Sequence, residues 1–132
     1  MIKTSISVII LFSIVTALVF LYFAEDLAEG LCENKIYETY LSPDQSLKAV
    51  TFQRDCGGTD GATTQISILD ASQSLENRAG NVFVVAGAPK HQAPDITWNS
   101  DQEVTVHYQT DGSEIKAETH WGAKIPLKIN YQ

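Results

Sequence analysis

Residues 54–65, RDCGGTDGATTQ, include the types that most resemble a reactive site. A cysteine beside glycines could act as a nucleophile, and a glycine-rich turn could hold a phosphate. A reactive thiol needs a lowered pKa, yet no histidine lies near Cys56 in sequence and Arg54 is offset by Asp55. The phosphate-loop pattern GxxxxGK[ST] is absent. We therefore interpret this stretch as a turn between two strands, in which glycines permit positive φ.

The chain has two cysteines, Cys32 and Cys56, and both follow an apolar N-terminal segment. In an exported domain two cysteines usually pair, because the compartment is oxidising. A disulfide between them would close a loop of about 25 residues and contribute roughly 3.5 kcal/mol in the chain-entropy treatment. The sequence therefore predicts a disulfide, with a reactive Cys56 thiol as the alternative.

The other catalytic candidates are three histidines and a pair of acids. His91, His107 and His120 lack the short spacings of a zinc site, although His107 and His120 could meet on adjacent strands. Asp101 and Glu103 could act as paired carboxylates, but acids next to a turn are normally solvated. No serine lies in a GxSxG elbow. We expect no catalytic residue, no metal and no cofactor.

Aromatic residues gather in the second half of the chain, and they could form a binding surface. Trp98, Tyr108 and Trp121 fall on segments with strand patterning, and His91 falls in the breaker segment GAPKHQAP, residues 87–94. Aromatic side chains on neighbouring strands more often pack across the sheet than bind a partner. These four residues are nevertheless the candidates for an interaction surface, since recognition residues often lie on loops held by a rigid sheet.

An N-terminal membrane helix precedes these residues. Residues 6–24 contain no charge and would form a helix about 28 Å long, close to the thickness of a bilayer core. Lys3 precedes this segment and acidic residues follow it, which favours a cytoplasmic N-terminus. A cleaved signal peptide is the alternative, but Tyr22 would then occupy a position that prefers a small residue. We expect an anchor in residues 1–30, inserted in the lipid bilayer through residues 6–24, and an exported domain in residues 31–132.

The exported part has the pattern of a small all-β domain. Short alternating segments at residues 35–41, 47–54, 63–69, 81–86, 95–98, 103–109, 115–121 and 123–131 are separated by turn signals. Residues 70–80 are polar and predict a loop or one helical turn. Two hairpins look alike, since residues 42–45 (SPDQ) and 99–102 (NSDQ) each place Asp-Gln before a strand. The fold class is a small antiparallel β-sandwich or curled meander of about seven or eight strands.

Several segments of this domain resemble one known family. The order SPDQ, RDCG, TTQISIL, GNVFVV and a later W-x-SD is similar to that of an uncharacterised bacterial family of short exported or membrane-anchored domains of unknown function. Members look like chains that carry SPDG, RDCG and GNVF segments, and this sequence has SPDQ where the family has SPDG. The resemblance implies an extracytoplasmic domain and no known activity.

Charge and motifs together lead to an expected function. The formal net charge of −7 argues against binding to nucleic acid. We expect a single-pass protein of the bacterial inner membrane with its C-terminal domain in the periplasm or outside. We expect that domain to be a non-enzymatic module that binds another envelope protein or a surface ligand. The alternatives are a small envelope hydrolase that uses the carboxylates or histidines, and an immunity protein against an envelope-acting toxin.

Overall fold

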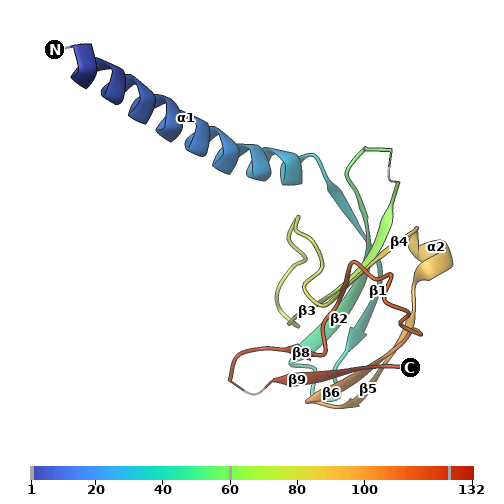
Figure 1. The fold of residues 1–132 in the computed structure, drawn as a ribbon. Coiled ribbons are helices and arrows are strands. Elements are labelled where there is room, and N and C mark those ends of the chain that lie inside the picture. Colours follow the sequence, from blue (N-terminus) through green and yellow to red (C-terminus); the bar gives the residue numbers. More distant parts are fainter. Residues whose placement is uncertain (1, 60, 125) are drawn as a thin grey trace. The chain divides into compact units, whose positions relative to one another are not determined.

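The chain consists of an N-terminal helix and a β domain (Figure 1). The computed structural model describes residues 2–59, 61–124 and 126–132, and it divides into two compact units, Met1–Leu31 and Cys32–Gln132. The first unit is helix α1, Ile2–Gly30. Its segment Ser5–Ala24 has a mean hydropathy of 2.7 and is long and apolar enough to cross a membrane, as membrane anchors and signal sequences both are.

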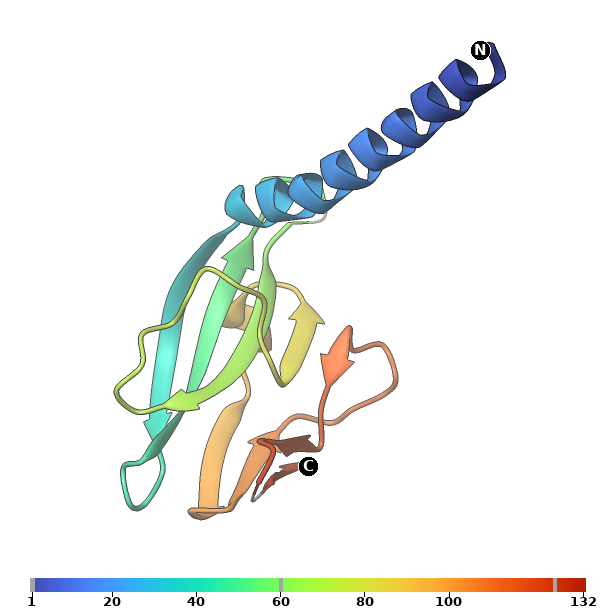
Figure 2. The same ribbon diagram turned by 90° about the vertical axis from the view of Figure 1, so that its left-hand side faces the viewer.

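The second unit is a β-sandwich-like domain, as the sequence predicted. Sheet A contains five strands in the order β1-β2-β3-β4-β7, and sheet B contains four strands in the order β5-β6-β9-β8 (Figure 2). Sheet A is formed by β1 (Glu33–Leu41), β2 (Leu47–Asp55), β3 (Thr63–Asp70), β4 (Phe83–Ala86) and β7 (Lys116–Ala117). Sheet B is formed by β5 (Asp95–Ser100), β6 (Glu103–His107), β8 (His120–Trp121) and β9 (Leu127–Tyr131).

The hydrophobic core lies between the two sheets. Because side chains alternate along a strand, one face of β2 and β3 points toward sheet B. That face carries Ala49, Ile66 and Ile68, and sheet B contributes residues such as Val104 and Ile129 from the facing strands. These side chains are almost fully buried. One hydroxyl in this core, Oγ1 of Thr51, is buried without a hydrogen-bond partner among the described residues.

The centre of the opposite face of sheet A is also buried, although no second sheet of the described residues covers it. Val50 and Phe52 point to this side and are 1% and 0% exposed. The connection between β3 and β4, residues 71–82, runs across this face and is called the crossing loop below (Figure 2). It hydrogen-bonds to Arg54 and Gln65, which flank Phe52 on this face. An irregular segment therefore serves as the outer layer of the sheet.

The glycine-rich stretch is the predicted strand connection. It joins β2 to β3, Gly57 and Gly61 have φ of 72° and 75°, and Cys56 is disulfide-bonded to Cys32. The disulfide prediction is confirmed, and Cys56 has no free thiol.

The C-terminal third differs from the prediction. Residues 115–131 form three short strands instead of two longer ones, so the described residues contain nine strands. β9 pairs with β6 in parallel, while the other pairs are antiparallel. The breaker segment contains one short helix, α2 (Pro89–Gln92), with proline at its first turn, where no backbone N–H is needed.

Candidate functional site

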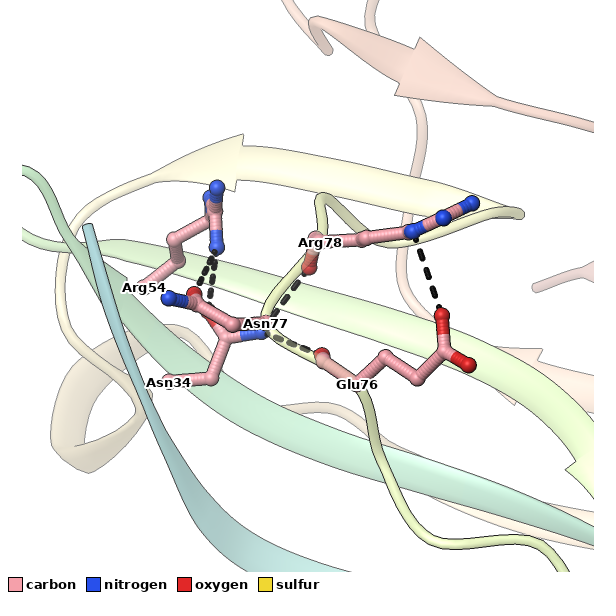
Figure 3. A network of polar contacts seen from close by, with 5 residues as sticks. All are labelled: Asn34, Arg54, Glu76, Asn77 and Arg78. Carbon is pink, nitrogen blue, oxygen red and sulfur yellow. Dashed lines mark hydrogen bonds and ion pairs between the residues drawn. The ribbon is translucent and has the colours of Figure 1, made fainter. Parts of the chain in front are cut away.

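The crossing loop is held in place by a buried arginine on β2. Arg54 is only 5% exposed, and among the described residues it forms no ion pair. Its Nη1 donates to Oδ1 of Asn34 at 2.8 Å and to Oδ1 of Asn77 at 3.0 Å (Figure 3). A buried charge is costly unless polar groups surround it, so these amide oxygens are needed where they stand. The guanidinium thereby links β1, β2 and the crossing loop.

The two asparagines extend this network to the backbone. Nδ2 of Asn34 donates to the carbonyl oxygens of Glu76 at 3.1 Å and Arg78 at 2.8 Å (Figure 3). Nδ2 of Asn77 donates to the carbonyl oxygen of Cys32 at 2.9 Å. Each side-chain amide therefore accepts a hydrogen bond from Arg54 through its oxygen and donates hydrogen bonds to backbone carbonyls through its nitrogen, so both polar groups of the amide have partners. The start of β1 and the middle of the crossing loop are fixed to each other.

The end of the crossing loop has its own attachments. The backbone N–H of Gly80 donates to Oε1 of Gln65 at 2.6 Å, and Nζ of Lys116 donates to the Gly80 carbonyl at 3.1 Å. Asn81 pairs through its side-chain amide with both the N–H and the C=O of Ile68, each at 2.8 Å. Its amide thus imitates a neighbouring strand. These bonds fasten residues 76–81 of the crossing loop to sheet A.

The crossing loop lines a half-open cavity of about 270 Å³ against the outer face of β3. Leu69 and Leu75 supply apolar wall, and Ser67 and Gln73 supply polar groups. At the lining, Nε of Arg78 pairs with Oε2 of Glu76 at 3.1 Å, and both side chains are more than 70% exposed. An exposed ion pair of this kind contributes little to stability, about 0–1 kcal/mol. The pair is therefore available to a partner at low cost, on a loop that is already ordered.

The histidines do not converge. β9 lies between β6 and β8, so His107 and His120 do not meet on adjacent strands, as the sequence had left possible. His120 is paired with Lys128, and Lys128 is paired with Glu103, at the far end of β6 from His107. Nε2 of His107 hydrogen-bonds Oγ1 of Thr97 at 2.8 Å. Among the described residues, no group of three or more His, Cys, Asp or Glu side chains is placed to hold a metal.

The predicted carboxylate pair is divided between two structural contacts. Oδ1 of Asp101 accepts the backbone N–H of Asp44 at 2.8 Å, and Oε1 of Glu103 accepts Nδ2 of Asn130 at 2.7 Å. The two similar turns seen in the sequence thus lie against each other. Within its own turn, hydrogen bonds from Ser46 lower the pKa of Asp44. These acids stabilise turns and strand pairs.

The aromatic candidates pack against the core. Nε1 of Trp98 donates to the carbonyl oxygen of Tyr40 at 3.0 Å. The ring of Tyr108 meets Phe83 edge-on, with centroids 5.1 Å apart, and Trp121 is also partly buried against the core. The exposed His91 lies apart from them on α2. The three rings are half-buried and His91 is exposed, so a binding role for Trp98, Tyr108, Trp121 and His91 stays a prediction.

Two features of the structure were not predicted from the sequence. The crossing loop was expected only as a connection, and nothing in its polar composition indicated that it covers Phe52. β1 is an edge strand with exposed apolar side chains, including Ile36 and Tyr37. The sequence did contain a signal for a covering layer. Val50 and Phe52 alternate with Ala49, so this strand carries apolar side chains on both faces and both faces must be buried.

No protein-family model, no curated protein and no solved structure matches this chain. The candidate site therefore depends on its geometry alone.

Proposed function

We propose that this protein is a membrane-tethered, non-enzymatic binding module of the bacterial envelope. α1 anchors it in the inner membrane through residues 6–24, and the β domain lies in the periplasm or outside. The apolar helix, the lysine before it and the acids after it support this topology. The disulfide supports an oxidising compartment for the domain.

The observation that carries the binding role is the ordered crossing loop. A surface loop normally needs few buried anchors, yet this one is bonded to a buried guanidinium, to the side-chain amides of Asn34 and Gln65 and to a lysine, and its own Asn81 bonds to β3. Binding by an ordered loop avoids the entropic cost of fixing it, which is the advantage of preorganisation. The loop presents a cavity with Arg78 and Glu76 beside apolar wall, a combination suited to a segment of another envelope protein.

Site-specific photocrosslinking in intact cells tests this role. A photoreactive residue at the exposed Ser74 on the crossing loop should capture a discrete envelope partner. The same residue at the exposed Ser113, in the turn before β7, is the matched control and should capture little. The variant Asn34→Ala, which frees the middle of the loop, should reduce the Ser74 adduct. Equal labelling from Ser74 and Ser113, or an adduct indifferent to Asn34→Ala, would refute the binding role.

Topology and processing are tested separately. Alkaline phosphatase fused after Gln132 should be active, because the enzyme needs an oxidising compartment, and a reporter that works only in the cytoplasm should be silent there. Intact mass of the membrane fraction should include residues 6–24. A silent phosphatase fusion would contradict the proposed orientation, and a shortened chain would indicate a cleaved signal.

A further inference from the structure

β1 is a free edge of sheet A. It pairs with β2 on one side, and in the described sheet it has no strand on the other. Its nine residues are long for an edge, since a typical strand has about 5–6 residues and exposed edges are usually kept short. The opposite edge, β7, has two residues. An edge strand carries unpaired backbone groups that can form a ladder with another strand.

Exposed apolar side chains concentrate on this edge. Among the described residues of the β domain, four large apolar side chains are exposed: Ile36 at 55%, Tyr37 at 55%, Leu41 at 51% and Ile115 at 68%. Three of these four belong to β1. A cluster of this kind beside a free ladder is typical of an interaction surface.

The charges on β1 match those of a second, antiparallel β1. A bulge at Tyr37 sets Lys35 opposite Gln53 and Glu38 opposite Thr51, two positions apart on β2, so Lys35 and Glu38 share one face. A two-fold axis between Ile36 and Tyr37 places each Lys35 opposite Glu38 of the other copy. The Lys35–Glu38 contact therefore occurs twice by symmetry.

Other registers do not offer this match over a long overlap. The register that sets Lys35 against Glu33 overlaps only residues 33–35, whereas the Lys35–Glu38 register overlaps residues 33–40. Charges on an edge strand commonly hinder pairing with another chain. Here opposite charges directly across the ladder favour it. Oε2 of Glu38 also accepts the hydroxyl of Tyr40 at 2.9 Å, which holds this carboxylate above the sheet face.

We propose that β1 pairs antiparallel with β1 of a second copy of this chain, joining two A sheets into one continuous sheet. The interface is small, and the membrane anchor compensates for this, because tethering two domains to one surface raises their effective concentration. This contact rests on the proposed membrane anchor, but it uses a surface distinct from the crossing loop and so is independent of the proposed binding role.

The full-length protein in its membrane is the material for the test. Two differently tagged copies are expressed together with a photoreactive residue at Tyr37, and an adduct that carries both tags is measured. The same residue at the exposed Ile115 is the matched control. Lys35→Glu alone and Glu38→Lys alone each place like charges opposite each other twice, and each should lower the adduct about fivefold. A Lys35→Glu copy expressed with a Glu38→Lys copy restores both opposite-charge contacts and should restore the adduct.

The charge-exchanged pair separates this contact from its alternatives. Restoration in the mixed pair would support the proposal and exclude misfolding as the cause of the single-variant losses. An adduct from Tyr37 with a different protein only would overturn it in favour of an extended segment of another partner. The proposal would also be overturned if no doubly tagged adduct formed, or if a photoreactive residue at Ile115 gave an equally strong one. The same holds if the single charge changes left the adduct unchanged, or if the mixed pair did not restore it.

Discussion

Replacing Asn34 by alanine removes the side chain that connects buried Arg54 to the crossing loop. The change deletes one hydrogen bond from the guanidinium and two hydrogen bonds to the carbonyl oxygens of Glu76 and Arg78. A hydrogen bond to a charged group contributes about 1.5–3 kcal/mol when it is partly buried, and each of the two at the surface contributes about 0.5 kcal/mol. Asn34→Ala should therefore lower the free energy of unfolding by about 3 kcal/mol. That is a large share of the roughly 5–15 kcal/mol typical of a domain.

The assay is urea unfolding of the oxidised β domain, followed by tryptophan fluorescence. Thr39→Ala is the matched control, because Thr39 is an exposed residue on the same face of β1. A surface change of that kind should stay within about 0.5 kcal/mol. Amide hydrogen exchange adds location, since residues 71–79 should exchange faster in Asn34→Ala while the β2–β3 ladder stays protected.

Two results would refute the reasoning. A loss no larger than that of Thr39→Ala would mean that Arg54 finds equivalent partners without Asn34. Unchanged exchange in residues 71–79 would mean that the attachments at Gly80 and Asn81 alone hold the crossing loop.

Three further outcomes follow from the described contacts. Replacing Cys32 and Cys56 together by serine should cost about 3.5 kcal/mol of unfolding free energy by chain entropy, measured by urea unfolding, and a smaller loss would indicate a compact unfolded state. Thr51→Val should raise the unfolding free energy by about 1 kcal/mol, because it replaces an unpartnered buried hydroxyl by a methyl group, and a loss would show that the hydroxyl is hydrogen-bonded. Burial raises the pKa of both Tyr40 and Tyr131, and the Glu38 carboxylate adds to the effect at Tyr40. The pKa of each tyrosine in the folded state exceeds its value of about 10 in the unfolded state. The protonated tyrosines therefore contribute fully to folding stability below pH 10, and this contribution is lost as the pH rises further. Ultraviolet absorbance should then show both ionising after the exposed tyrosines, and ionisation with those tyrosines would contradict the burial.

The sequence allowed correct prediction where the signal is local. Hydropathy alone predicted that residues 6–24 form a helix long enough to cross a membrane. The Cys32–Cys56 disulfide was predicted because two cysteines in an exported domain usually pair. The first strands were predicted within one or two residues, because alternation and turn residues mark both ends. Where the strands are only two residues long, as β7 and β8 are, alternation cannot define them.

The failures concern contacts between distant segments. His107 and His120 could have met if their segments had formed adjacent strands, but β9 lies between those strands through a parallel pairing that no local pattern specifies. A sequence alone predicts that Arg54 is exposed, since arginine is rarely buried without a carboxylate partner. Its burial depends on Asn34 and Asn77, which are 20 and 23 residues away.

The disulfide and the crossing loop are parts of one structural unit. Cys32 and Asn34 lie together at the start of β1, and Arg54 and Cys56 lie together at the end of β2, so the sulfur bridge and the guanidinium network fasten the same strand ends. The carbonyl oxygen of Cys32 also accepts the bond from Asn77. Groups within one network do not contribute additively to stability. Loss of the disulfide should therefore remove the constraint on the unfolded chain and also weaken the hydrogen bonds that hold the crossing loop. The same bridge that indicates export thus helps to set the conformation of the loop on which the proposed binding depends.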